Sequence, residues 1–363
     1  MSCADKNSLF EELSPFRTGV KFSNDLAYDE TFNIFTYRNY YNGGGVGLGD
    51  INNDGLIDIF FNSNLEKNRL YLNKGDFKFE DITDFAGVAG TKSWSTGVSI
   101  ADINADGFLD IYVSNSGDIK GDNKQNELYI NNGDLTFTEM AADYGLDDTG
   151  YSTHAAFFDY DRDGDLDCYL LNNSYKGGFR ITNIGTNQRP IRDSVGGDKL
   201  FRNDDGYFND VSEESGIYGS VIGFGLGVTV GDVNNDGWMD IYVSNDFFER
   251  DYLYINNADG TFSEELEYQI KSISAASMGA DMADINNDGY SEIFVTDMLP
   301  EPDERIKTVT TFDNWDRHQY IKTSGYWNQF TRNTLQLNNG DDTFSEIGRL
   351  TGCLLYTSPS PRD

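Results

Sequence analysis

Several residue types are scarce in this sequence, and each shortage argues against a class of protein. Among 363 residues there are three cysteines, Cys3, Cys168 and Cys353, too few and too scattered for a disulfide framework or a zinc site. Only 27 basic residues stand against 61 acidic ones, so the formal net charge is -34. Nucleic acids and anionic membrane surfaces are bound through clustered lysine and arginine, so neither is an expected partner. No apolar run approaches the roughly 18 residues that span a bilayer.

Recognised catalytic motifs are missing as well. The chain has two histidines, and His154 stands where related strands carry glycine or alanine, which favours a packing role. Neither a G-x-S-x-G elbow nor an H-E-x-x-H motif occurs, and the glycine clusters at 43–49 and 223–227 lack the G-x-G-x-x-G spacing. We therefore predict a protein without catalysis of its own. Paired carboxylates for glycoside hydrolysis remain an alternative in so acidic a chain.

What the sequence does contain is one nine-residue acidic pattern, D-x-[DN]-x-D-G-x-x-[DE], in five copies called loops 1 to 5 here. They begin at residues 50, 102, 159, 232 and 284, so their starts are 52, 57, 73 and 52 residues apart. Such regular self-similarity is typical of repeat architectures. Positions 1, 3, 5 and 9 are Asp50, Asn52, Asp54 and Asp58; Asp102, Asn104, Asp106 and Asp110; Asp159, Asp161, Asp163 and Asp167; Asp232, Asn234, Asp236 and Asp240; Asp284, Asn286, Asp288 and Glu292.

These residue types suit calcium, a hard cation that takes six to eight oxygen ligands. Positions 1, 3 and 5 can point three side-chain oxygens inward, and glycine at position 6 permits the sharp turn. Position 7 can then offer its carbonyl and position 9 a closing carboxylate. Magnesium fits less well because it keeps its waters in a smaller shell. A metal-free acidic turn is the alternative, but crowding unpaired carboxylates is costly. We predict about five structural Ca²⁺ sites.

The residues around each loop indicate β-structure. An EF-hand would need a glutamate at position 12 and flanking helices, whereas Phe61 occupies that position in loop 1. Short apolar runs such as 59–61 and 111–113 follow the loops, and strands rich in small residues such as 45–49 precede them. A second recurring element, for example 68–76, is a strand that enters an Asn/Gly/Asp turn, which indicates a hairpin. Four short strands and one loop per period predict an all-β propeller.

The loops and hairpins together resemble the FG-GAP/VCBS repeat family, whose best-known propeller is the head of the integrin α subunit. The resemblance covers about residues 43–350. It implies that each loop joins the first two strands of a blade and holds calcium. Propellers of this family usually have seven blades. Here we expect five, near residues 43–90, 91–150, 151–218, 219–272 and 273–348, plus the start of a sixth, as in a truncated propeller.

The two ends of the chain need separate treatment. Residues 1–9 are predicted to be a lipoprotein-like linker, because the small residues ending in Cys3 resemble a bacterial lipobox, with Cys3 as the lipidated residue. A stray N-terminal cysteine is the alternative, since no signal peptide precedes it as written. Residues 10–352 are assigned to the propeller. Residues 353–363 resemble a translated sequencing adaptor and are excluded from the fold, the alternative being a genuine Pro/Ser tail.

Two insertions interrupt the period, at about 174–197 and 299–332. The first is basic and includes Arg189. The second carries a candidate ligand loop for an unidentified protein or carbohydrate, formed by Trp315, Arg317, Tyr320, Tyr326 and Trp327. The alternative is that this segment covers a gap between blades and buries its own aromatic rings.

Calcium sites of the extracellular type have a Kd of about 10⁻⁴–10⁻³ M, and the free calcium of the cytosol is too low to fill sites this weak. We therefore predict an exported, surface-attached, monomeric binding or adhesion module, bound to a membrane only through a lipid at Cys3. The rival is a carbohydrate-active or other propeller enzyme with its site in the insertions or in a missing C-terminal part.

Overall fold

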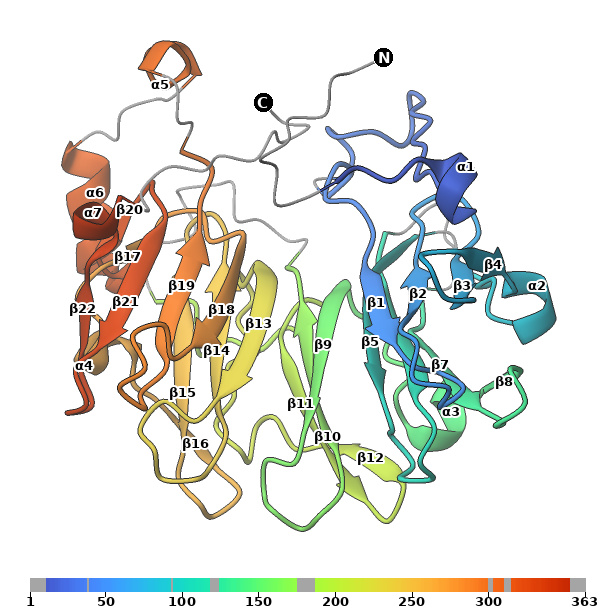
Figure 1. Ribbon diagram of the computed structural model, residues 1–363. Helices are drawn as coiled ribbons and strands as arrows, with labels where there is room; N and C mark the ends of the chain where they lie inside the picture. Colours follow the sequence, from blue (N-terminus) through green and yellow to red (C-terminus); the bar gives the residue numbers. More distant parts are fainter. Residues whose placement is uncertain are drawn as a thin grey trace.

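Five four-stranded antiparallel sheets stand side by side in an arc (Figure 1). The computed structural model describes residues 11–37, 39–92, 94–117, 124–174, 187–299, 303–309 and 315–352. Within each sheet the strands follow the chain order, and most are joined by short loops and hairpins. The exceptions include the two insertions, each of which connects the second strand of a sheet with its third. The prediction of an all-β fold built from four-stranded propeller blades is confirmed.

The strands are short, as the apolar runs predicted. Their bounds are β1 (Val46–Gly49), β2 (Asp58–Phe61), β3 (Arg69–Asn73) and β4 (Phe79–Asp81) in blade 1; β5 (Ser95–Ala101), β6 (Asp110–Asn115), β7 (Glu127–Asn131) and β8 (Phe137–Glu139) in blade 2; β9 (Ser152–Phe158), β10 (Asp167–Asn172), β11 (Lys199–Asp204) and β12 (Tyr207–Asp210) in blade 3; β13 (Gly225–Gly231), β14 (Asp240–Asn245), β15 (Tyr252–Asn256) and β16 (Phe262–Glu264) in blade 4; β18 (Gly279–Ala283), β19 (Glu292–Thr296), β21 (Thr334–Asn338) and β22 (Phe344–Glu346) in blade 5.

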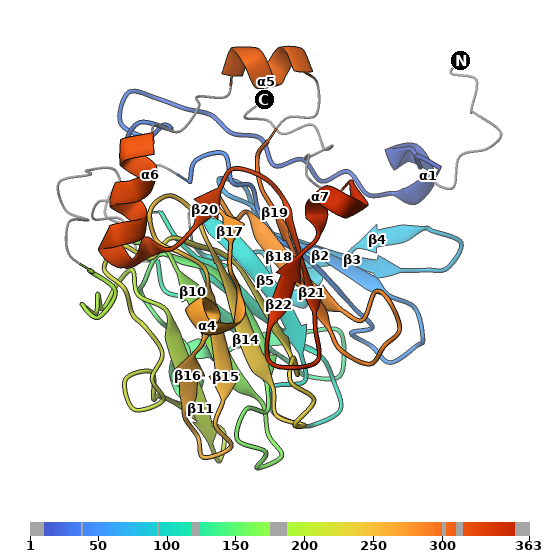
Figure 2. The same ribbon diagram turned by 90° about the vertical axis from the view of Figure 1, so that its left-hand side faces the viewer.

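Short helices and one small sheet complete the described fold. Four one-turn helices, α2 (Thr83–Ala86), α3 (Ala141–Tyr144), α4 (Leu266–Gln269) and α7 (Gly348–Thr351), follow the fourth strands of blades 1, 2, 4 and 5. The other elements are α1 (Pro15–Thr18), α5 (Asp303–Val309), α6 (Trp315–Ile321), the π-helical turn η2 (Lys322–Tyr326) and the parallel pair β17 (Ile273–Ser274) and β20 (Gln329–Phe330). Figures 1 and 2 place α5 and α6 at the same end of the sheets. None of the described helices has the length and apolar character to cross a membrane.

The first strands of neighbouring blades lie against each other, which explains their small residues. A Cβ added to Gly97 in β5 would lie 2.3 Å from the carbonyl oxygen of Thr153 in β9. The same close approach occurs between β13 and β18, where a Cβ on Gly227 would lie 2.9 Å from the Cα of Gly279. His154 in β9 packs against Gly97, and its burial lowers the pKa of the imidazole. These contacts agree with the expected packing role of His154.

The hydrophobic core is divided into layers between adjacent sheets. The layer between blades 1 and 2, for instance, combines Phe60, Leu70 and Leu72 with Ile111 and Val113. Similar clusters fill the spaces between blades 2 and 3, 3 and 4, and 4 and 5. A fully buried side chain of this size contributes about 1.5–3 kcal/mol, so these layers hold the arc together.

A buried polar latch recurs at the start of the third strands. In blade 2, the side chain of Asn126 accepts from the N–H of Asn115 (2.8 Å) and donates through Nδ2 to Tyr112 Oη (2.8 Å) and Ser152 Oγ (3.0 Å). In blade 4 the same position is Asp251, and its carboxylate accepts from the backbone N–H of Asn245 and from the hydroxyls of Tyr242 and Ser277. The asparagine at the start of the recurring hairpin thus ties the third strand to the second.

The two versions of the latch differ in their response to pH. Burial raises the pKa of Asp251 from its ordinary 3.8 to about 7. The folded protein therefore binds this proton more tightly than the unfolded chain does. It follows that the contribution of Asp251 to stability falls as the pH rises from about 4 to about 7, and stays at its lowest above that.

We expect Asp251→Asn to remove this pH dependence, because an asparagine can repeat the bonds of Asn126 without ionising. At pH 8 the variant should be more stable than the parent by about 1–3 kcal/mol, whereas near pH 4 the gain should disappear. Urea unfolding of both proteins at fixed calcium, at several pH values between 4 and 8, measures the difference. Parallel stability profiles for the two proteins would contradict the assignment.

Candidate metal centres in the five loops

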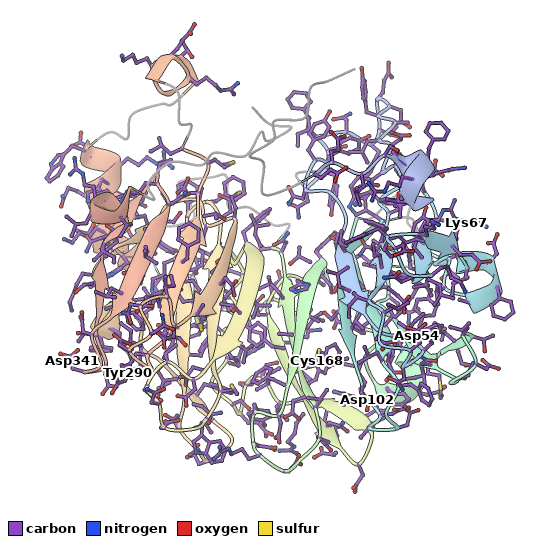
Figure 3. The ribbon with its side chains drawn as sticks, viewed as in Figure 1. Asp54, Lys67, Asp102, Cys168, Tyr290 and Asp341 are labelled. Carbon is purple, nitrogen blue, oxygen red and sulfur yellow. The ribbon has the colours of Figure 1, made fainter. Side chains whose placement is uncertain are left out.

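Each acidic loop connects the first and second strands of a blade, and its first aspartate organises the turn. In loop 1 the N–H groups of Asp54 and Gly55 donate to Oδ1 and Oδ2 of Asp50, at 3.0 and 2.7 Å. Loops 2, 4 and 5 repeat both bonds, and loop 3 keeps the one from Gly164 to Asp159, at 3.2 Å. The loops therefore curl around the carboxylate of position 1. Figure 3 shows the labelled loop residues Asp54, Asp102 and Tyr290 at the end of the sheets away from α5 and α6.

Two positions of each loop adopt the left-handed backbone conformation. Glycine at position 6 does so throughout, with φ of 85° at Gly55 for example, as the sequence predicted. Position 4 does so as well, with φ of 58° at Asn53, 57° at Ala105 and 62° at Arg162. Asparagine tolerates this conformation better than most residues. Its presence at position 4 in three of the five copies was a signal that the sequence analysis left unused.

Position 9 has a structural role in addition to the predicted ligand role. Asp58 is buried, and its two oxygens accept from the N–H of Ile51 (3.0 Å) and the N–H of Asn73 at the end of β3 (2.7 Å). Asp110, Asp167 and Asp240 repeat this pair of bonds. The longer Glu292 of loop 5 instead accepts from Ile285 N–H and from the Asn286 amide. The closing carboxylate thus anchors the loop to its own blade.

Within the described part of the chain, the buried closing carboxylates form no salt bridge with a lysine, arginine or histidine. Burial raises the pKa of Asp110 to about 6 and those of Asp167 and Asp240 to about 7. The two backbone hydrogen bonds to each carboxylate oppose this rise, whereas the nearby loop carboxylates add to it. A cation held between the loop carboxylates would relieve their mutual repulsion and favour the ionised form. The electrostatics of the loops are therefore those of a cation site.

Loop 3 gives the most direct test of whether the residues fit a metal. Asp159, Asp161 and Asp167 each offer one carboxylate oxygen, and these oxygens lie within 4.8 Å of one another. Oδ1 of Asp159, of Asp161 and of Asp165 are all buried without a hydrogen-bond partner. All of these donors are oxygens, as a hard cation such as calcium requires. The residues of loop 3 therefore fit a bound calcium ion.

The side chain of Asp165 adds a carboxylate that the sequence analysis did not assign to the site. Position 7 was expected to contribute only its carbonyl. Burial and the neighbouring Asp163, Asp161 and Asp159 raise the pKa of Asp165 to about 6. Asp165 therefore adds negative charge beside the cluster, although it is not among the three residues whose oxygens lie within 4.8 Å of one another. The signal was an aspartate where the other four copies have Leu56, Phe108, Trp238 and Tyr290.

The structure divides the five residues of the candidate ligand loop into two groups. Trp315 (71% exposed), Arg317 and Tyr320 (37% exposed) lie on α6. Tyr326 is fully buried, and the indole of Trp327 donates to the carbonyl of Ile270 at 2.9 Å. Tyr326 and Trp327 thus pack inward, as the alternative interpretation of this segment anticipated for its aromatic rings.

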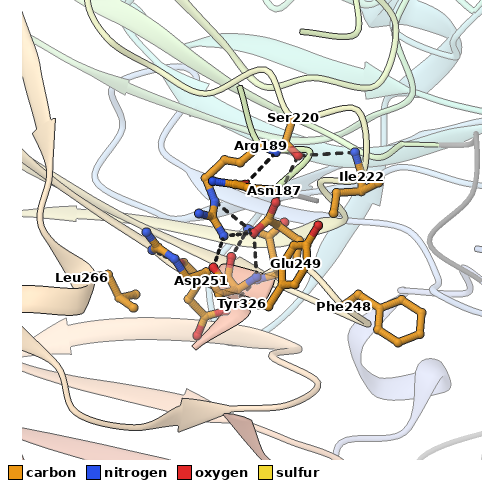
Figure 4. Close-up of polar contacts among 12 residues, drawn as sticks. Asn187, Arg189, Ser220, Ile222, Phe248, Glu249, Asp251, Leu266 and Tyr326 are labelled. Carbon is orange, nitrogen blue, oxygen red and sulfur yellow. Dashed lines mark hydrogen bonds and ion pairs between the residues drawn. The ribbon is translucent and has the colours of Figure 1, made fainter. Parts of the chain in front are cut away.

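A buried ion pair joins the first insertion to blade 4, and its arginine also bonds the second insertion (Figure 4). Arg189 Nη2 lies 2.7 Å from Glu249 Oε1 and also donates to the carbonyl of Gly325 at 3.0 Å. Ser220 donates its hydroxyl to the other oxygen of Glu249, and the Arg189 guanidinium lies 5.8 Å from the centre of the Tyr326 ring. Both charged side chains are almost completely buried. The two insertions are therefore fixed to blade 4 by the same charged pair.

Some predicted features fall outside the described residues. These are Cys3, the linker 1–9, the tail 353–363 and parts of the two insertions, at 175–186, 300–302 and 310–314. Cys168 lies in β10 as a buried free thiol, and burial raises its pKa well above the ordinary value, so it packs as a small apolar residue.

Comparison with curated proteins finds cartilage acidic proteins and an integrin α subunit. Cartilage acidic protein 1 of Xenopus tropicalis is 29% identical over 215 residues, which cover 57% of this chain and 29% of that protein. The human protein of the same name is 27% identical over 237 residues, covering 64% and 32%. Mouse integrin alpha-3 is 30% identical over 99 residues, covering 24% and 9%. The chain thus spans about a third or less of the length of these relatives.

Two solved structures show a more distant likeness. A lectin of Agrocybe aegerita that recognises non-reducing terminal N-acetylglucosamine aligns with a TM-score of 0.42 and 18% identity, covering 82% of this chain and 63% of that one. The V. cholerae biofilm matrix protein Bap1 aligns with a TM-score of 0.39 and 14% identity, covering 71% and 35%.

A family model matches the repeats themselves. The FG-GAP-like repeat is found at residues 50–113, 116–170, 191–243 and 232–295, which together make up more than half of the chain. Each match contains at least one complete acidic loop and at least part of the strand that follows it. The chain therefore belongs to the FG-GAP-like repeat family.

Proposed function

We propose that this chain is a calcium-stabilised propeller module that binds a protein or carbohydrate ligand and has no catalysis of its own. The observation that carries the calcium proposal is loop 3, where buried carboxylate oxygens of Asp159, Asp161 and Asp165 have no hydrogen-bond partner. The other four loops have the same spacing and the same left-handed positions, so we propose about five sites. When bound, calcium supplies the positive charge that the clustered carboxylates lack.

Simple energetics favour a structural role for the metal. At a calcium concentration ten times Kd, each site adds about 1.4 kcal/mol to stability, and five independent sites add about 7 kcal/mol. An ordinary domain has a total stability of about 5–15 kcal/mol. Sites of extracellular type need more calcium than the cytosol offers. We therefore propose an exported protein that is attached to the cell surface through a lipid at Cys3. Metabolic labelling with a fatty-acid analogue tests the attachment: the parent protein should be labelled and the Cys3→Ser variant should not.

We propose the exposed side of α6 as the ligand surface. Trp315 and His318 are neighbours with ring centres 6.0 Å apart, and His318 lies 5.5 Å from Phe330, which is 43% exposed. The Arg332 guanidinium lies over Phe330, at 5.6 Å from the ring centre. Exposed aromatic rings beside cationic groups suit stacking on a sugar or a protein hot spot. The surface lies at the opposite end from the loops, so calcium would support it only through the fold.

We expect Trp315→Ala to weaken ligand binding at least tenfold without changing stability, because Trp315 is exposed and large aromatic anchors carry much of the binding energy. A glycan array and a panel of extracellular matrix proteins, screened with the parent protein, provide the ligand for the measurement. Phe16→Ala is the matched control, since Phe16 is 98% exposed on the separate N-terminal segment. Equal losses for both variants, or turnover of a bound glycan by the parent protein, would contradict the proposal.

A further inference from the structure

Neighbouring acidic loops are joined by asparagine side chains that cross from one blade to the next. Asn53, at position 4 of loop 1, donates through Nδ2 to the carbonyl of Gly107 in loop 2 at 2.9 Å. Asn235, at position 4 of loop 4, makes the same bond to Gly289 in loop 5 at 2.8 Å. In both cases the acceptor is the position-6 carbonyl, directly before the position-7 carbonyl expected to face the metal. Position 4 therefore connects the backbone of one loop to the ligand-bearing part of the next.

A second set of bridges comes from the asparagine that ends the third strand. Asn131 donates through Nδ2 to the carbonyl of Ile51 in loop 1 (2.8 Å) and to that of Leu109 in loop 2 (3.1 Å). Its backbone N–H also holds the closing carboxylate of Asp110. One residue thus touches two loops. Any change that orders loop 1 also restrains the group that positions the closing ligand of loop 2.

The same bridge occurs further along the arc. Asn256 connects Tyr160 of loop 3 (2.8 Å) with Met239 of loop 4 (3.3 Å). Asn338 connects Val233 of loop 4 (2.7 Å) with Ser291 of loop 5 (3.3 Å). Loops 3 and 4 are further linked because the Arg162 guanidinium lies 4.9 Å from the ring centre of Trp238. Loops 3, 4 and 5 therefore form a continuous series.

Among the residues that the structure describes, both kinds of bridge are missing between loops 2 and 3. Position 4 of loop 2 is Ala105, which has no side-chain amide to donate a hydrogen bond. The equivalent asparagine of blade 3, Asn203, directs Nδ2 to Leu166 of its own loop at 3.3 Å, and among the described residues it makes no bond to Ile103 of loop 2. Blades 2 and 3 remain packed through their apolar layer. The series of polar bridges is thus interrupted at one boundary, by two independent features.

We propose that calcium binding is cooperative within loops 1 and 2 and within loops 3, 4 and 5, but independent across the boundary between blades 2 and 3. The inference rests on the proposed calcium binding. A loop ordered by its ion presents a fixed bridge to its neighbour, so the neighbour loses less conformational entropy when it binds its own ion. By linkage, each site of a bridged pair strengthens the other by the same factor.

Tryptophan-sensitised terbium(III) luminescence can read one loop at a time. Trp238 occupies position 7 of loop 4, whereas Trp94, Trp315 and Trp327 lie outside the loops. Loop 5 can be weakened by Asp288→Asn, which removes a charge and keeps an oxygen to accept the N–H of Tyr290. We expect this change to weaken terbium binding at loop 4 about fivefold.

The bridges themselves are tested by removing them. In an Asn235→Ala/Asn338→Ala background, Asp288→Asn should change terbium binding at loop 4 less than twofold. The matched control is Asn287→Ala/Asn73→Ala, the same two positions in blades 5 and 1. Asn73 donates through Nδ2 to Ile57 of its own loop, and its Oδ1 accepts from Gly75 in the same blade, so among the described residues its side chain bridges no two loops. The control should keep the full effect. An unchanged effect in the first background would overturn the inference.

The boundary is tested by moving the reporter to loop 2 with Phe108→Trp and Trp238→Phe. Asp54→Asn in loop 1 should then weaken terbium binding about fivefold, and Asp163→Asn in loop 3 less than twofold. Equal effects of the two changes would overturn the predicted interruption. A parent protein that gives no terbium signal displaceable by calcium would instead overturn the calcium proposal, and the coupling with it. The two failures are therefore distinguishable.

Discussion

Removal of calcium should lower the midpoint of thermal unfolding by about 10–20 °C, the equivalent of about 7 kcal/mol from five sites. The physical reason is the crowding of carboxylates in each loop, where burial raises the pKa values of Asp110, Asp167 and Asp240. Without a cation these groups must either take up protons or repel one another. Differential scanning calorimetry in calcium and in a chelator measures the shift.

The control for this experiment must separate binding from charge screening. A chain with a formal charge of -34 gains some stability from any cation. Magnesium at the same concentration supplies the same screening but prefers a smaller, more hydrated shell. A midpoint that rises equally in magnesium and in calcium would mean that the loops hold no specific calcium.

A single loop can be tested in the same way. Asp163→Asn should cost at least about 1.4 kcal/mol in calcium and nothing in chelator, because it disables one site and weakens the sites coupled to it. Asp134→Asn is the matched control: Asp134 is an exposed aspartate in the blade 2 hairpin, where its Oδ1 accepts from Thr136, a bond that asparagine can keep. A calcium-independent loss in Asp163→Asn would assign this aspartate to the turn alone.

The second large effect should come from the ion pair that fixes the insertions. We expect Arg189→Ala to destabilise the protein by about 3–5 kcal/mol, because it leaves the buried carboxylate of Glu249 without its partner. The nearby Ser220 hydroxyl and the N–H of Arg250 still bond Glu249 but cannot neutralise it. Chemical denaturation at fixed calcium measures the loss.

An exposed pair provides the comparison for Arg189. Arg202 lies 2.8 Å from Asp204, and both side chains are more than a third exposed. Arg202→Ala should therefore cost less than about 1 kcal/mol, as surface pairs do. If the two alanine variants were equally stable, the Arg189–Glu249 pair would not be what holds the insertions in place.

The repeating parts of this molecule could be predicted from the sequence, for a physical reason. Each loop and each hairpin is formed by residues within nine positions of each other. The residues that shape the turn and the candidate metal ligands can therefore be recognised in one short stretch of sequence. The strands followed, since short apolar runs bounded by such turns have few other ways to fold. The asparagine that recurs at position 4 lies within the same nine residues. Its role was not predicted because binding a metal does not require it.

The non-repeating parts could not be predicted in the same way. Arg189 and Tyr326 come from different insertions, 137 residues apart, and they meet beside Glu249 only after blades 3 to 5 have assembled. Neither the repeat spacing nor a sequence motif predicts such a contact. The sequence could therefore identify Tyr326 and Trp327 only by their aromatic character, which suits a ligand surface and a packed core equally well. The structure separates them from Trp315 because burial depends on the whole fold.

The placement of the loops and of α6 at opposite ends of the sheets has a consequence for how such proteins diversify. Mutations in the exposed residues of α6 touch neither the acidic loops nor the apolar layers between blades. If α6 is the ligand surface, as proposed above, selection can alter what this end recognises while the other end preserves the fold. A library randomised at Trp315, Arg317 and Tyr320 should accordingly contain mostly folded proteins, which makes this arc of blades a scaffold on which new specificities can be evolved.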